Sequence, residues 1–112
     1  MTQFSINEFR AEAPFADLGV TSDDYVPLDA ILDTNIEITA VTPFTNDKGE
    51  GVYILAKDDQ GNRFYLCTHS IGITAVLTKE KLLTALELGD TITCKIVRRK
   101  SQNSDRMVYA FA

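Results

Sequence analysis

The sequence has few of the residues from which disulfide or metal scaffolds are built. Among its 112 residues are two cysteines, Cys67 and Cys94, and one histidine, His69. Two cysteines do not make the disulfide framework of a small secreted domain, so intracellular thiols are the default expectation. The chain has no C-x-x-C pair, and three soft ligands fall short of the four that structural zinc uses. We therefore expect neither a metal nor a cofactor.

Long apolar segments are also absent. No run approaches the roughly 20 apolar residues that a membrane-spanning helix needs. The opening residues, MTQFSINEFRAEAP, do not place an apolar block after a basic region, as a secretory signal does. Hydrophobic residues nevertheless make up 45% of the chain, which is typical of a globular protein and too many for a disordered one. We expect one cytoplasmic domain with no membrane partner.

Catalytic motifs are missing as well. No glycine-rich phosphate loop follows a strand, and the Gly-Glu-Gly sequence at residues 49–51 is only a turn. Cys67 and His69 would share one face of a strand, but that spacing is poor for the direct hydrogen bond of a nucleophile and its base. The sequence therefore predicts a protein that is not an enzyme.

The charges are distributed unevenly. The chain carries a formal net charge of −5. Residues 1–37 contain eight acidic residues and one basic residue, whereas residues 38–112 contain eight acidic and ten basic residues. Five of the 11 basic residues lie between Lys95 and Arg106. This pattern indicates an acidic, partly irregular N-terminal arm, residues 1–27, attached to a mildly basic domain, residues 28–112.

From residue 35 onward, apolar and polar residues alternate with the period of two that is typical of strands. Strands are predicted over residues 35–44, 52–57, 63–70, 90–100 and 106–112. Before the fourth strand, Leu82 and Leu86 share a face ahead of Gly89, which predicts a helix ending at residue 88. Either Ser70 or Thr78 can serve as its N-cap, and the β-branched Ile71, Ile73 and Thr74 leave the first half of residues 70–88 open. An all-β chain of five strands, with one helix between the third and fourth, is the arrangement of the OB-fold barrel. Another small β-barrel or an α+β roll is the alternative.

Four local features stand out in these segments: Gly51, the D-x-x-G turn of Asp58–Gly61, the Thr68-x-Ser70 end of an aromatic strand, and a basic hairpin closed by Tyr109 and Phe111. With these features, residues 28–112 resemble single-stranded-DNA-binding proteins of bacteriophages and mobile elements of Gram-positive bacteria. The resemblance implies a non-catalytic protein that binds single-stranded DNA largely without sequence preference during DNA replication or recombination. Replication or recombination proteins and further copies of the chain are the partners that it suggests. Many bacterial relatives carry an acidic C-terminal tail, whereas here the excess of acidic residues lies at the N-terminus.

A protein that binds single strands needs cations along a groove and flat side chains on which bases stack. Basic residues mark the outward side of the predicted strands, and the alternation places Tyr53 and Tyr65 on that side. Phe44 lies at the mouth of the first loop, and Tyr109 lies beside the basic hairpin. The candidate contacts are Phe44, Tyr53, Lys57, Arg63, Tyr65, Lys95, Arg98, Arg99, Lys100, Arg106 and Tyr109.

Each candidate has a structural alternative. A basic hairpin is also a common solvated turn that protects β proteins from aggregation. The alternative for Tyr53 and Tyr65 is packing under the N-terminal arm or in the core. Phe64 and Phe111 are expected in the core. The acidic arm supports a second hypothesis, a protein-interaction module on the same fold. A combined hypothesis is that the arm shields the basic surface until DNA displaces it.

Overall fold

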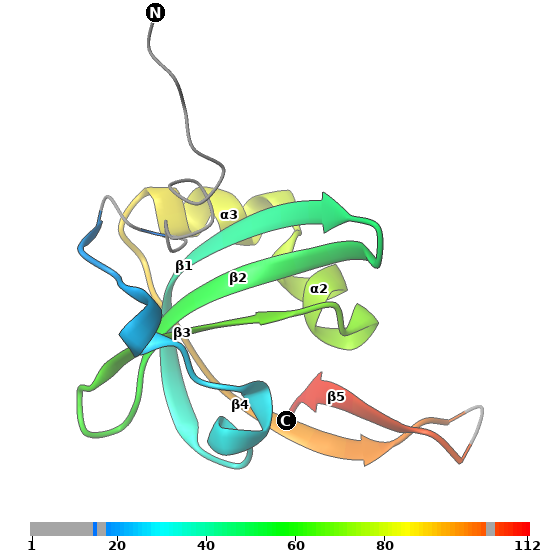
Figure 1. The fold of residues 1–112 in the computed structure, drawn as a ribbon. Helices are drawn as coiled ribbons and strands as arrows, with labels where there is room; N and C mark the ends of the chain where they lie inside the picture. Colours follow the sequence, from blue (N-terminus) through cyan, green and yellow to red (C-terminus); the bar gives the residue numbers. More distant parts are fainter. Residues whose placement is uncertain (1–14, 16–17, 103–104) are drawn as a thin grey trace, which may run out of the picture.

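The computed structural model describes residues 15, 18–102 and 105–112 of the chain, which is mostly β (Figure 1). In these residues, two 3-10 turns and two short helices accompany five strands. Where the sequence predicted one helical segment between the third and fourth strands, the structure has two helices. In chain order the elements are η2 (Ser22–Asp24), η3 (Leu28–Ile31), β1 (Asn35–Asn46), β2 (Gly49–Lys57), β3 (Arg63–Thr68), α2 (Ile71–Leu77), α3 (Glu80–Glu87), β4 (Ile92–Lys100) and β5 (Met107–Phe111).

The break between α2 and α3 lies at Thr78 and Lys79. The backbone N–H and the Oγ1 hydroxyl of Thr78 both donate to the Thr74 carbonyl oxygen, at 3.0 and 2.8 Å, which ends α2. Lys79 then adopts an extended backbone, with a ψ of 130°, and becomes the N-cap of α3. Gly89 follows α3 with a φ of +94°, the left-handed conformation that commonly ends helices.

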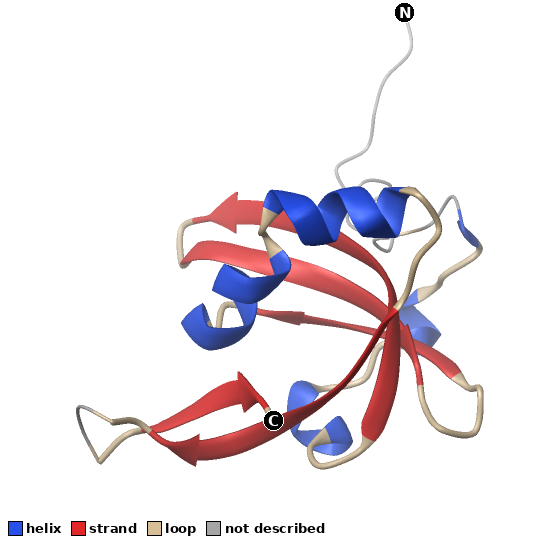
Figure 2. Ribbon diagram, turned by 180° about the vertical axis from the view of Figure 1, so that it is seen from behind, coloured by secondary structure: helices blue, strands red, loops and turns tan. Residues whose placement is uncertain are grey.

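The five strands form one curled antiparallel sheet in the order β3-β2-β1-β4-β5, which resembles a half-barrel (Figure 1). A register shift between Ile38 and Ala40 interrupts the pairing of β1 with β2, and such bulges increase the bend of a strand. β3 and β5 are the two edges of the sheet. The β4–β5 hairpin extends away from the body of the molecule (Figure 2).

Helix α2 and the 3-10 turn η3 occupy the opening between β3 and β5. Gly72 of α2 lies so close to β5 that an added Cβ would be 2.6 Å from the Tyr109 carbonyl oxygen. On η3, Asp29 Oδ1 accepts a 2.6 Å hydrogen bond from the Tyr109 hydroxyl, and η3 also contacts β3. The half-barrel is therefore covered along its opening by α2 and η3.

The main core fills the concave face of the sheet, because alternate residues of each strand point inward. Phe64 is buried at 5% exposure, and Phe111 packs against the cluster, so both core predictions are confirmed. The buried residues of this core are Leu28, Ile31, Ile36, Ile38, Val52, Ile54, Ala56, Phe64, Leu66, Ile73, Leu77 and Ile96.

A second, smaller cluster lies on the convex face of the sheet. Val20 is buried there with Leu55 of β2 and Tyr65 of β3, and Phe15 and Ala40 pack against them. The N-terminal residues that the structure describes therefore cover part of this face. The aromatic residues Phe4 and Phe9 of the predicted arm lie outside the described residues. Within the described ranges, no helix has the length and apolar character needed to cross a bilayer.

Candidate nucleic-acid interface

Three aromatic rings gather on the convex face of β1–β3. The ring centroids of Phe44 and Tyr53 lie 4.5 Å apart with an interplanar angle of 33°, and those of Phe44 and His69 lie 5.2 Å apart at 77°. All three side chains are half-buried, so part of each ring faces solvent. We call Phe44, Tyr53 and His69 the aromatic cluster.

Gly51 makes room for this cluster. It pairs with Phe44 across β1 and β2, and a Cβ at this position would lie 2.7 Å from Phe44 Cζ and 2.8 Å from His69 Nδ1. His69 Nδ1 also lies 3.2 Å from the Glu50 carbonyl oxygen, which fixes the imidazole ring. Because a carbonyl oxygen only accepts hydrogen bonds, this contact places a proton on Nδ1.

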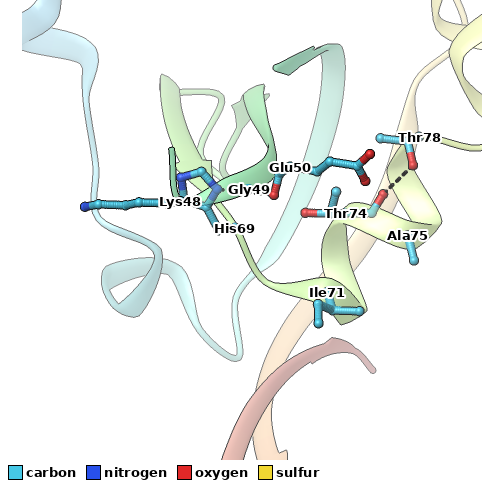
Figure 3. A pocket seen from close by; sticks show the side chains of 8 residues that line it. All are labelled: Lys48, Gly49, Glu50, His69, Ile71, Thr74, Ala75 and Thr78. Atoms are coloured by element: carbon cyan, nitrogen blue, oxygen red, sulfur yellow. Dashed lines mark hydrogen bonds between the residues drawn. The ribbon is translucent and has the colours of Figure 1, made fainter. Parts of the chain in front are cut away.

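Two open pockets meet at His69. The first has a volume of about 390 Å³ and lies between the β1–β2 turn and α2, with Lys48 and His69 on one side and Thr74 and Thr78 on the other (Figure 3). The second has a volume of about 450 Å³ and lies between the start of α2 and the β4–β5 hairpin. It is lined by His69, Ser70, Ile71, Gly72, Ser101, Arg106, Met107, Val108 and Tyr109. His69 therefore joins the aromatic cluster to the basic hairpin.

The basic residues of the hairpin divide between its two faces. Arg98 pairs with Tyr109, whereas the next residue, Arg99, pairs with Val108 and points to the opposite side. The Arg98 guanidinium carbon lies 6.0 Å from the centroid of the Tyr109 ring. Arg98 and Tyr109 thus form a mixed basic and aromatic surface, and Lys95 shares the alternate side with Arg99.

Two hydrogen-bonded carboxylates accompany this surface. Lys100 Nζ lies 2.9 Å from Asp105 Oδ1 within the hairpin, between two exposed side chains. The hydrogen bond from Tyr109 to Asp29 raises the pKa of the Tyr109 phenol, because losing the proton would set two negative oxygens against each other. Tyr109 therefore stays a neutral ring at physiological pH.

The remaining candidates lie at the other end of β2 and β3, away from the hairpin. Lys57 is exposed and pairs with Glu37 and Arg63 across the strands. Tyr65 is only 8% exposed because residues 18–26 lie over it, which is the packing alternative that the sequence left open. Burial raises the pKa of its phenol. The Arg63 guanidinium donates to two backbone carbonyls of the same N-terminal residues.

The structure links the candidates through His69, which contacts Phe44 of the aromatic cluster and lines the second pocket together with Arg106 and Tyr109. Arg98 adjoins this group through the Tyr109 ring. Sequence reasoning considered His69 only as a metal ligand or a catalytic base. Its position on the outward face, four residues after Tyr65, was the signal that also fits a stacking residue. Among the described residues, no group of three histidine, cysteine or acidic side chains is arranged to hold a metal.

No protein family, curated protein or solved structure matches this chain in comparisons of sequence and fold.

Proposed function

We propose that this protein is a non-catalytic OB-fold protein that binds single-stranded DNA with little sequence preference. It would act in the replication or recombination of a phage or mobile element, as the family resemblance implies. The observation that carries the proposal is the continuity of the aromatic cluster with the basic hairpin through His69.

The position of this region on the fold supports the proposal. In OB-folds, oligonucleotides bind across the face of the second and third strands and between the loops that join strands one to two and four to five. The aromatic cluster lies at the end of β1–β3 nearest the first of these loops, and the hairpin forms the second. A single strand crossing from Phe44 to Arg98 would meet stacking surfaces first and cations next.

The chemistry of the side chains fits bases and phosphates without selecting among bases. A ring stacks on any base, and each such stack is worth about 1–3 kcal/mol by alanine substitution. Arg98 and Arg106 supply charge for phosphates. A mixture of rings and cations therefore favours affinity for single strands over readout of their sequence.

The direct test is substitution of the cluster. Phe44→Ala is expected to weaken binding to oligo-dT by roughly 5- to 150-fold, the range for loss of one stacked base. Leu88→Ala, at a side chain that is 78% exposed beyond the end of α3, is the control and should leave the affinity unchanged. Equal affinities of the wild type and the folded Phe44→Ala variant in fluorescence-anisotropy titrations would refute the proposal.

A protein-interaction module is the second candidate function. Ile71 is 85% exposed and lies with Met107 and Val108 around the second pocket, so an apolar surface is available beside the hairpin. Exposed apolar side chains in such a group suit a protein partner. A pull-down with nuclease treatment separates the two candidates, because a partner bridged by DNA is lost and a directly bound protein is retained.

A further inference from the structure

Residues 18–26, which we call the cover segment, lie against the convex face of β3. Val20 is 3% exposed and packs on Leu55 and Tyr65. The Tyr25 ring meets the Tyr65 ring edge-on, with centroids 5.5 Å apart and an interplanar angle of 63°. An aromatic ring on a strand that could stack a base is thus occupied by another ring of the same chain.

The Arg63 guanidinium is likewise bound by groups of the cover segment. Its Nη1 donates to the Leu18 carbonyl oxygen at 3.0 Å, and its Nη2 donates to the Gly19 carbonyl oxygen at 3.1 Å. The carboxylate of Asp24 lies 4.0 Å from the same guanidinium. An arginine fork that holds two oxygen acceptors side by side has the geometry with which it binds a phosphate. The cover segment therefore gives Arg63 oxygens in the positions that a phosphate would fill.

The cover segment is held by few strong contacts. The Val26 N–H donates to the Tyr65 carbonyl oxygen at 2.9 Å, beside a parallel bridge between Tyr25 and Tyr65. Leu18 and Tyr25 remain 51% and 47% exposed, so Val20 is its one fully buried anchor among the described residues. The contact between Arg63 and Asp24 is solvent-exposed, and such pairs contribute little stability. Local release of this segment should cost far less than unfolding.

The covered surface continues the proposed binding face. Tyr53 of the aromatic cluster pairs with Cys67, and Tyr65 is two residues from Cys67 on the same side of β3. Uncovering Tyr65 and Arg63 would extend the line of rings and cations along the strand. The extended face would hold a longer stretch of DNA than the open part alone.

We propose that the β3 face beneath the cover segment is a second part of the binding site, and that long single strands displace the segment from it. Arg63 exchanges the Leu18 and Gly19 carbonyls for a phosphate, and Tyr65 exchanges the Tyr25 ring for a base. The inference rests on the proposed function, since it assigns two more contacts to the same ligand. Short strands fill the open part and leave the segment in place.

The test loosens the cover segment in the full-length chain and varies the DNA length. Val20→Asp places a charge at the buried anchor and is expected to tighten binding to oligo-dT of about 16 nucleotides roughly tenfold. Oligo-dT of about 4 nucleotides should bind as it does to the wild type; the two lengths bracket the site sizes of OB-folds. Tyr25→Ala, at a half-exposed ring, is the second variant if Val20→Asp unfolds in circular dichroism.

The salt dependence identifies Arg63 as the added contact. For the long oligonucleotide, Arg63→Ala should make the slope of log affinity against log salt shallower by about 0.7, the amount expected for one phosphate fewer on a single strand, in the wild type and in the loosened variant alike. For the short oligonucleotide, Arg63→Ala should leave the slope unchanged. An unchanged affinity in both loosened variants, or an Arg63→Ala slope equal to the wild-type slope with the long oligonucleotide, would contradict the inference.

Hydrogen exchange gives a readout in the wild type. In the free protein, the Val26 amide donates a hydrogen bond to the Tyr65 carbonyl oxygen. Its exchange rate should rise when the long oligonucleotide binds and should stay the same when the short one binds. If the wild type binds both lengths and Val26 stays protected, the inference fails while the proposed function stands. If the wild type binds neither, both fail.

Discussion

The half-buried Cys94 is the residue whose chemistry the fold changes most clearly. Its side chain packs against the main core beside Ile92 and Ile96, and burial raises the pKa of its thiol from 9.0 to about 11. The thiolate is the reactive form of cysteine, so Cys94 is inert near neutral pH. A structural role is therefore assigned to Cys94.

This pKa predicts a loss of stability in alkali. The folded state holds the Cys94 proton more tightly than the unfolded state, so its contribution is complete below about pH 9 and is lost as the pH rises through about 11. The raised pKa of Tyr109 acts in the same direction. Urea unfolding midpoints should fall over this window, and Cys94→Ala should reduce the slope without abolishing it. The same slope in the wild type and in Cys94→Ala would show that the thiol is not involved.

The outward-facing residues of β2 and β3 show which features of the site the sequence could predict and which it could not. The alternation of β2 and β3 correctly placed Tyr53, Arg63 and Tyr65 on one outward side, because strand period is a local property. It could not show that Tyr65 is covered, since that depends on contacts from Val20 and Tyr25, 40 or more positions earlier. Backbone carbonyls, such as those that bind Arg63, have no signature in a sequence.

At the scale of elements, the β4–β5 hairpin is where the structure sharpens the sequence prediction most. Arg98, Arg99 and Lys100 are adjacent in sequence and were predicted as one basic arm. Strand geometry puts Arg98 with Tyr109 on one face and Arg99 with Val108 on the other. A charge cluster in the sequence is thus two half-clusters in space, and Arg98 is the arginine that lies beside the Tyr109 ring.

Neighbouring arginines therefore provide matched variants. Arg98→Ala should weaken oligo-dT binding several-fold and make the slope of log affinity against log salt shallower by about 0.7. Arg99→Ala removes the same charge from the opposite face and should have a clearly smaller effect. Anisotropy titrations at several salt concentrations measure both. Equal losses for the two variants would mean that the hairpin acts only through its net charge.

The two helices between β3 and β4 were only partly predictable from the sequence. Leucine spacing predicted a helix ending at Gly89, and α3 does end there. The β-branched residues of α2 left that half ambiguous, because local propensity is a weak guide where tertiary packing decides. Close packing of Gly72 on β5 and burial of Ile73 and Leu77 in the core favour the first helix.

In the molecule as a whole, a chain with a formal net charge of −5 presents a surface of basic and aromatic side chains. The described part of the acidic N-terminal region lies next to the basic and aromatic residues of the domain, with Asp24 near Arg63 and Asp29 bonded to Tyr109. Net charge alone would have argued against a nucleic-acid ligand. Phosphate binding depends instead on the local surface that a strand of DNA meets.

A salt-dependent titration of the wild type with labelled oligo-dT tests the central proposal most directly. Micromolar or tighter binding is expected at 50 mM salt, since cations and stacked rings act together. The affinity should fall steeply with salt, with a slope of roughly −2 to −3.5 if three to five basic side chains each neutralise a phosphate. No binding at about micromolar protein in 50 mM salt, or binding that salt does not weaken, would contradict the proposal that this surface holds single-stranded DNA.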